Sequence, residues 1–298
     1  LFYHLLYYKV MIFLNCPFNE KDECKALGGK WDSQKKKWYV PDGINASNFK
    51  KWIVNDKKEE ILAHNKINKV IELSPSSLDF QINKCHRCFY LSKKLGIQTN
   101  NFLPPVFNQL DLIQKDFFID KDTSFISEKL PKGRFLQDNE LPKKISSSLL
   151  KDNKGRDFKL VGIPDLVIEF EDKTYGIIDF KTTKISEKKA DFYKFQLEAY
   201  ATIFENPGEI NSAKTPLLSP VIKLAILQFD PLKIENKNGM NCNFIFDMGY
   251  VELENRIYEK LIDRVTLALD ILQMNKPPII NENCNDCAFF KKQSQLII

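Results

Sequence analysis

Two aspartates and a lysine near the middle of the chain could support metal-dependent chemistry. They lie within residues 162–181, which read GIPDLVIEFEDKTYGIIDFK. The β-forming apolar side chains predict one strand over residues 163–170 and a second over residues 174–180. The polar residues between the two strands predict a short hairpin turn centred on Asp172.

This turn would bring three reactive side chains together. Asp165 and Asp179 would lie directly opposite each other, with Cβ atoms about 4.5–5.5 Å apart, and Lys181 would face the same side as Asp179. Two opposed carboxylates repel each other unless a cation lies between them, and Mg²⁺ prefers such oxygen ligands. The ammonium of Lys181 could hold an attacking water or stabilise a developing negative charge. The alternative is a solvated hairpin with ordinary surface charges.

The same residues resemble a known superfamily. Pro164-Asp165 followed by Asp179-Phe180-Lys181 resembles the signature of the PD-(D/E)xK nucleases. The resemblance implies an α/β (α+β) fold in which helices flank a mixed central β-sheet, as in restriction endonucleases. It also implies Mg²⁺ or Mn²⁺ held by Asp165 and Asp179, with the carbonyl of Phe180 as a further ligand. Lys181 would then assist the attacking water in phosphodiester hydrolysis.

A helix predicted over residues 187–205 adds two candidate side chains. Gln196 and Tyr200 are four residues apart and therefore share one helix face. A Gln-x-x-x-Tyr pair after the Asp-x-Lys strand resembles the RecB-like branch, which includes the CRISPR-adaptation nucleases. The resemblance implies that both side chains line the active site and orient substrate or metal-bound water. The alternative for Tyr200 is a half-buried aromatic of the helix.

The third metal ligand is uncertain at this stage. In the RecB-like branch a histidine on an earlier helix is often a ligand, but the helix predicted over residues 102–118 contains no histidine. Asp111 is the nearest candidate replacement, with an ordinary surface charge as the alternative.

Four of the seven cysteines form two Cys-x-x-Cys pairs, Cys85 with Cys88 and Cys284 with Cys287. Two such pairs can supply the four thiolates of a tetrahedral site, which would close a very long loop and stabilise the domain. Zinc and a [4Fe–4S] cluster both accept four thiolates. The spacing favours Zn²⁺, whereas the resemblance to iron–sulfur members of the branch favours the cluster. Two unrelated pairs are the remaining alternative.

Residues 11–53 are predicted to form a small α/β module with a strand, a short helix and a hairpin. The segment resembles an accessory module found beside primases and other DNA-processing domains. Trp31 and Trp38 flank a turn with lysines at positions 35–37, where aromatic and basic side chains could stack on bases and hold phosphates. The favoured alternative is that these two tryptophans and Trp52 form the core of the module.

The remaining segments complete the predicted organisation. Residues 1–10 are interpreted as an upstream extension, residues 54–70 as a helical linker and residues 71–298 as the nuclease domain. Within that domain we expect one helix from Ser74 through Leu91, carrying Cys85 and Cys88. Four further elements are predicted, in chain order: an irregular polar stretch over 120–158, a buried strand over 221–229, a hairpin over 242–246 and 249–253, and an amphipathic helix over 254–274.

Composition narrows the functional classes. The 298 residues, 43% of them hydrophobic, can form one large domain and a small one. The net charge of +5 is compatible with a phosphate-rich partner. The sequence contains no run of about 18 apolar residues, so it predicts no membrane span. The three histidines lie near no Ser or Cys nucleophile motif, and no glycine-rich Walker loop is present, which argues against triad hydrolysis and an ATPase motor.

These features predict a metal-dependent nuclease in DNA repair, recombination or defence. We expect DNA as the nucleic-acid partner, together with protein partners from such a system. An odd number of cysteines and the absence of a signal-peptide pattern favour a reducing cytoplasm. The alternative is a catalytically inactive, metal-stapled nucleic-acid-binding or structural subunit, although the complete Asp–Asp–Lys set argues against it.

Overall fold

The computed structural model describes residues 12–33, 35–41, 44, 46–49, 51–52, 70–97, 104–119, 121–137 and 139–296. The chain divides into two compact units, Leu1–Lys69 and Val70–Ile298. The predicted extension over residues 1–10, and the predicted linker up to residue 69, lie outside the described residues.

The first unit contains a three-stranded antiparallel sheet in the order β1-β3-β2. Its elements are β1 Ile12–Leu14, a 3₁₀ turn Phe18–Glu20, α1 Lys21–Ala26, β2 Lys30–Asp32, β3 Lys37–Val40 and a 3₁₀ helix Ala46–Phe49. Among the described residues of this unit, five buried side chains form a small core: Leu14, Cys24, Val40, Phe49 and Trp52.

The three tryptophans of the first unit differ in environment. Trp52 is buried, and its indole N–H donates to Glu20 Oε2 at 2.5 Å, so the core interpretation is correct for this residue. Trp31 is 50% exposed and contacts Trp38 edge-on across the hairpin, with ring centroids 5.8 Å apart. The core interpretation is therefore wrong for Trp31, because so small a sheet cannot cover both of its faces.

The second unit is built around a five-stranded mixed sheet in the order β14-β13-β10-β9-β5. Strands β10 and β13 are parallel, and the other neighbours are antiparallel, which confirms the predicted mixed α/β fold. The bounds are β5 Gly133–Phe135, β9 Leu166–Phe170, β10 Tyr175–Thr182, β13 Val221–Asn238 and β14 Asn241–Glu252.

The predicted hairpin register is confirmed. Strands β9 and β10 pair Tyr175 with Glu169 and Ile178 with Leu166, which is the register of a turn centred on Asp172. The carboxylate of Asp172 accepts hydrogen bonds from the backbone N–H and the hydroxyl of Thr174, at 3.0 and 2.7 Å. These bonds stabilise a turn that contains neither glycine nor proline.

The expectation of irregular structure over residues 120–158 is wrong in part. The stretch contains β5 of the five-stranded sheet and two short strands, β6 Ile145–Ser146 and β7 Leu150–Lys151, and it ends within β8 Asp157–Gly162. Strands β6, β7 and β8 form a second sheet together with β4 Ile71–Leu73. Strands of two or three residues are too short for an alternating pattern to be visible in the sequence.

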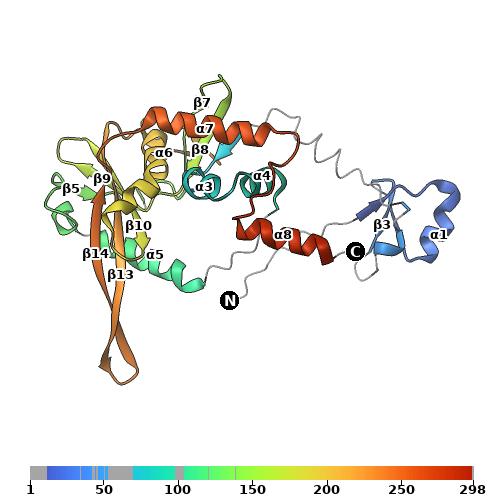
Figure 1. Cartoon of the computed structure of the whole chain (residues 1–298), viewed down its shortest axis with the longest axis horizontal. Helices are drawn as coiled ribbons and strands as arrows, with labels where there is room; N and C mark the ends of the chain where they lie inside the picture. Colours follow the sequence, from blue (N-terminus) through green and yellow to red (C-terminus); the bar gives the residue numbers. More distant parts are fainter. Residues whose placement is uncertain are drawn as a thin grey trace. The chain divides into compact units, whose positions relative to one another are not determined.

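The hairpin predicted over residues 242–253 is also wrong. These residues belong to the single strand β14, which pairs antiparallel with β13, and the turn between the strands contains Gly239 with a φ of +59°. Pro231 does not end β13, because it lies at a bulge where a missing N–H is tolerated. The two strands consequently extend beyond the rest of the sheet as a long hairpin (Figure 1).

Helices cover one face of the five-stranded sheet. Helix α6, Lys194–Glu205, contacts β10 and β13, and α7, Tyr258–Gln273, lies against α6 (Figure 1). The helix predicted over residues 187–205 is α-helical only from Lys194, because Glu187–Tyr193 forms a 3₁₀ segment. Ten of the twelve side chains of α6 are buried, as expected for a helix that is largely apolar around its circumference.

The opposite face of the sheet carries a second core. It is dominated by phenylalanines from four strands and from helix α5, Pro105–Phe118: Phe118, Phe135, Phe170, Phe180 and Phe229. Helix α5 therefore lies on the other side of the sheet from α6.

Arg256 joins helix α6 to strand β13 and pairs with a buried carboxylate of α6. Its guanidinium donates to both carboxylate oxygens of Glu198 and to the carbonyl of Val221, at distances from 2.7 to 3.0 Å. It also donates to Glu205 at 2.8 and 3.0 Å. The side chain of Glu198 is completely buried, so loss of Arg256 would leave an uncompensated charge in the core.

We therefore expect Arg256→Met to lower the free energy of unfolding by about 3 kcal/mol, measured by urea denaturation. Arg134→Met is the matched control, because Arg134 also pairs with two glutamates but is 54% exposed. That change should cost no more than about 1 kcal/mol. Equal effects of the two substitutions would contradict the assignment of Arg256 to core stability.

Candidate active site and cysteine site

The two candidate carboxylates meet where the β9–β10 ladder ends. Asp179 lies within β10, and Asp165 immediately precedes β9. Beyond the pair Ile178–Leu166, the side chain of Asp165 replaces the backbone as the partner of β10: its Oδ2 accepts the N–H of Phe180 at 2.8 Å. Asp165 is thereby held beside Asp179, as the register predicts.

Asp179 is almost completely buried, with an exposed fraction of 2%. Its Oδ1 accepts a hydrogen bond of 2.9 Å from the side-chain amide of Gln196, and its Oδ2 forms an ion pair with Lys181 Nζ. Burial raises the pKa of Asp179, and the negative charge of Asp165 raises it further, whereas Lys181 lowers it; the net direction is upward. The structure thus brings together four of the predicted residues: Asp165, Asp179, Lys181 and Gln196.

Tyr200 supports the site indirectly. Its hydroxyl donates to the carbonyl of Ile163 at 2.7 Å, two residues before Asp165, and its ring is buried. Burial raises the pKa of Tyr200. A Cβ at Gly162 would lie 2.8 Å from the Tyr200 ring, so the approach of the ring to this strand requires glycine. Through its hydrogen bond to the Ile163 carbonyl, Tyr200 therefore fixes the backbone that leads to Asp165.

Asp79 holds the helix that carries Gln196, and the sequence analysis did not identify it. It lies in a π-helical turn, Ser77–Gln81, and its Oδ2 accepts the backbone N–H of Gln196 at 2.6 Å. Burial raises the pKa of Asp79 to about 7. The available signal was a single acidic residue within the otherwise uncharged segment of residues 74–83.

Lys115 is a second residue that the sequence analysis missed. Its Nζ lies 3.1 Å from Asp165 Oδ1 and 3.1 Å from Asp111 Oδ2. Burial lowers the pKa of Lys115, but the carboxylates of Asp165 and Asp111 outweigh this effect and raise it. Asp111 therefore borders the site through a shared cation. The i, i+4 spacing of Asp111 and Lys115 on α5 was the available signal.

The donor set fits a hard divalent cation. Asp165 and Asp179 offer carboxylate oxygens side by side, and Gln196 Oε1 is buried beside them without a hydrogen-bond partner. A buried amide oxygen that lacks a donor is costly, and a metal-bound water could supply one. The residues present are therefore compatible with Mg²⁺ or Mn²⁺.

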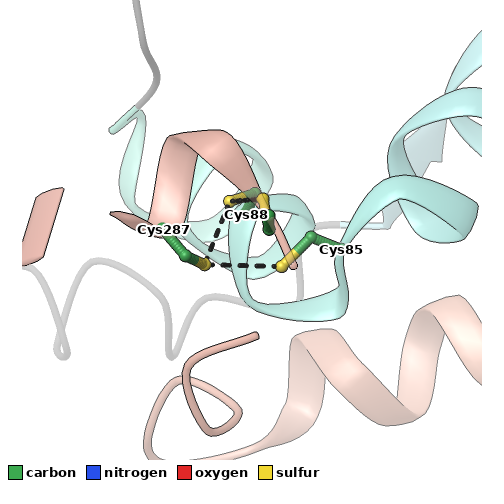
Figure 2. A group of neighbouring side chains, drawn as sticks. Cys85, Cys88 and Cys287 are labelled. Carbon is green, nitrogen blue, oxygen red and sulfur yellow. Dashed lines mark hydrogen bonds between the residues drawn. The ribbon is translucent and has the colours of Figure 1, made fainter. Parts of the chain in front are cut away.

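The four paired cysteines converge at a second site. Sulfur–sulfur distances are 3.6 Å for Cys85–Cys287, Cys88–Cys284 and Cys88–Cys287, and all four sulfurs lie within 4.8 Å of one another. Figure 2 shows Cys85, Cys88 and Cys287 pointing toward one another. This group could hold a metal ion.

The helix expected through residues 74–91 is interrupted at the cysteine site. It consists of the π-helical turn, α3 Ile82–Lys84 and α4 His86–Leu95, with Cys85 in an extended conformation between α3 and α4. The break turns Cys85 toward Cys287 on α8, Asn285–Leu296. An ion pair of 2.7 Å between Lys84 and Asp286 joins the residues next to these two cysteines.

Comparison with known proteins identifies the second unit. Residues 120–291 match the PD-(D/E)XK nuclease superfamily. The chain belongs to this superfamily. Membership suggests metal-dependent nuclease activity on a nucleic-acid substrate. A solved structure described as "Crystal structure of SSO0001" aligns with 79% of this chain and 91% of its own, at 14% identity and a TM-score of 0.43, a likeness too low to support an argument.

The first unit has separate relatives. Residues 11–53 match a domain of unknown function (DUF5710). Two proteins from Escherichia coli, both named DNA primase TraC, are 58% and 52% identical to this chain over 40 residues. The match covers 13% of this chain but only 4% and 3% of the primases, so it concerns the small module alone. Among the described residues of this PD-(D/E)XK protein, no helix has the length and apolar character needed to cross a membrane.

Proposed function

We propose that this PD-(D/E)XK protein is a divalent-metal-dependent nuclease that hydrolyses phosphodiester bonds of DNA in a repair, recombination or defence process. The observation that carries the proposal is the convergence of Asp165, Asp179, Lys181 and Gln196 at the end of the β9–β10 ladder. The contact between Gln196 and Asp179 also supports placement in the RecB-like branch. The free cysteines support a reducing cytoplasm as the compartment.

Each side chain has a distinct role in the proposed reaction. Asp165 and Asp179 would hold Mg²⁺ or Mn²⁺, with the Phe180 carbonyl as a further ligand. The bound ion would polarise the phosphate and lower the pKa of a water. Lys181 would position the attacking water or stabilise charge on the phosphate. Gln196 keeps Asp179 oriented, and Tyr200 fixes the backbone before Asp165.

Asp111 is the best candidate for an additional acidic ligand. Asp111 and Asp165 share the ammonium of Lys115, so both carboxylates border the same small region. A divalent ion bound there would compete with Lys115 for Asp165. The divalent ion and the ammonium of Lys115 therefore cannot both bind Oδ1 of Asp165 as Lys115 does here.

The catalytic roles can be tested with Asp179→Ala and Lys181→Ala. Asp179→Ala should abolish Mg²⁺- or Mn²⁺-dependent cleavage of labelled DNA, because it removes a metal ligand. Lys181→Ala should lose about a hundredfold in rate but still bind Mn²⁺ in a calorimetric titration. Glu171→Gln, in the exposed β9–β10 turn, is the control and should cleave like the parent.

Two outcomes would contradict the assignment. Cleavage by Asp179→Ala at the parental rate would show that the active site lies elsewhere. Binding of DNA by the parent without any cleavage would favour the inactive nucleic-acid-binding subunit.

We further propose that the four cysteines hold zinc. A tetrahedral ion with Zn–S bonds of about 2.3 Å places its sulfurs about 3.8 Å apart, close to the 3.6 Å of three pairs here. A [4Fe–4S] cluster binds each cysteine through a different iron and would spread the sulfurs farther apart. The site would join α4 to the segment around α8, and its role would be structural.

Elemental analysis of anaerobically purified protein should find one zinc per chain and no iron. Cys284→Ser should lose the zinc and lower the stability of the second unit, because the two pairs join segments about 200 residues apart. Cys242→Ser is the control, since Cys242 is exposed on the β13–β14 hairpin and should change neither property. A brown protein containing iron would overturn the zinc assignment without affecting the nuclease proposal.

We propose that residues 11–53 form an accessory module that contacts nucleic acid through Trp31 and the neighbouring lysines. Support comes from the exposure of Trp31 and of Lys35, Lys36 and Lys37 on the same hairpin. Aromatic and basic side chains in such proximity can stack on bases and neutralise phosphates.

Deletion of residues 1–53 should leave the second unit folded and active, because the two units have separate cores. Binding of single-stranded DNA should weaken, most strongly at low salt. Trp31→Ala in the full chain should reproduce part of the loss. An insoluble truncation, or unchanged binding by both proteins, would contradict this role.

A further inference from the structure

An aromatic pair lies directly beyond the candidate active site. Lys181 Nζ is 4.5 Å from the ring centroid of Tyr193, and the Tyr193 ring is 5.2 Å from that of Phe80. Asp179, Lys181, Tyr193 and Phe80 thus follow one another from the buried carboxylate outward. We call Phe80 and Tyr193 the aromatic platform.

Phe80 of the platform is exposed and Tyr193 is half-buried, although the chain around Phe80 is buried. Phe80 is 47% exposed, whereas its neighbours Leu78, Asp79 and Ile82 are 3% exposed or less. The π-helical turn Ser77–Gln81 therefore presents one large aromatic side chain outward from a segment that is otherwise part of the core. Such turns occur frequently at functional sites.

The platform is also fixed relative to the candidate reaction centre. Asp79, next to Phe80, accepts the backbone N–H of Gln196 at 2.6 Å. Gln196 in turn donates to Asp179 at 2.9 Å. Two hydrogen bonds therefore connect the backbone beside Phe80 to the carboxylate that would hold the metal.

The chain next to the platform is basic. Residues 181–194 contain five lysines and two acidic residues: Lys181, Lys184, Lys188, Lys189 and Lys194, with Glu187 and Asp191. Lys184 and Lys188 are exposed. In the same stretch Phe192, beside Tyr193, is 67% exposed. Exposed aromatic rings bordered by lysines are the combination that binds single-stranded nucleic acid, since rings stack on unpaired bases and lysines neutralise phosphates.

We propose that the aromatic platform stacks on unpaired bases and leads a single strand, or the frayed end of a duplex, into the candidate active site. The proposal rests on the proposed nuclease function and specifies its substrate class. A continuous duplex keeps its base faces stacked internally and offers the platform nothing to bind. The lysines contribute to binding of either form through the phosphates.

Binding measurements on the full chain carrying Asp179→Asn test the proposal separately from cleavage. The probes are a fluorescent 15-nucleotide oligo-dT and a fluorescent hairpin duplex with capped ends, each titrated by anisotropy at several salt concentrations. Phe80→Ala should weaken oligo-dT binding by about 5- to 100-fold and leave duplex binding and the salt slope unchanged. Lys188→Gln should weaken both probes and reduce the salt slope.

Two further substitutions separate stacking from folding. Phe80→Trp should retain or increase oligo-dT affinity, because it keeps an aromatic face. Phe80→Ile keeps an apolar contact with Tyr193 but removes that face, and it should lose affinity as Phe80→Ala does. Phe289→Ala is the matched control, since Phe289 is 50% exposed on α8, and it should bind like the parent.

The proposal is overturned if Phe80→Ala and Phe80→Ile bind oligo-dT with parental affinity. It is equally overturned if they lose the same factor for the duplex and the single strand. Cleavage by the parental protein is measured independently, so an inactive parent with intact Phe80-dependent binding would refute only the nuclease proposal. Parental cleavage with Phe80-independent binding would refute only the platform.

Discussion

The carboxylate of Asp179 is buried beside a second carboxylate, and much of the second unit is arranged around that constraint. A buried negative charge is costly, and a neighbouring like charge increases the cost. Lys181, Gln196 and Lys115 offset it by contacting one or the other carboxylate. Each compensating group comes from a different element or strand position, so the sheet and the helices on both of its faces must be assembled before the pair is stable.

Helix α6 transmits this constraint to the rest of the core. Because it is buried on nearly all sides, each polar group on it needs a partner from another segment. Asp79 accepts the N–H of Gln196 near its start, and Arg256 neutralises Glu198 farther along. The same helix therefore positions a functional side chain and joins the π-helical turn to α7. Polar contacts of this kind position the helix in addition to stabilising it.

The cysteine site joins two segments of the second unit that lie far apart in the sequence. It connects α4 to the segment around α8, where hydrogen bonds from Arg87 to the Pro278 carbonyl and from Tyr90 to the Met274 carbonyl add to the junction. Joining distant segments restricts the unfolded chain, so a metal here would contribute to folding. The chemistry proposed for Asp165 and Asp179 does not require these sulfurs, so the cysteine site is distinct from the candidate active site.

The sequence by itself determined the β9–β10 register and the cysteine pairs, because each follows from a local pattern: strand alternation around one turn, or a two-residue spacing. The mixed α/β class was implied by the resemblance of the Asp–Asp–Lys motif to a known superfamily. The sequence also placed Gln196 and Tyr200 on one helix face. Only the tertiary structure decided that Lys115 and Asp79 belong to the site, that Phe80 is exposed beside it, and that residues 241–252 form one strand. These features depend on contacts between segments far apart in the chain. Such contacts arise when buried polar groups of separate elements must pair with one another, and a local sequence pattern does not show which groups will meet.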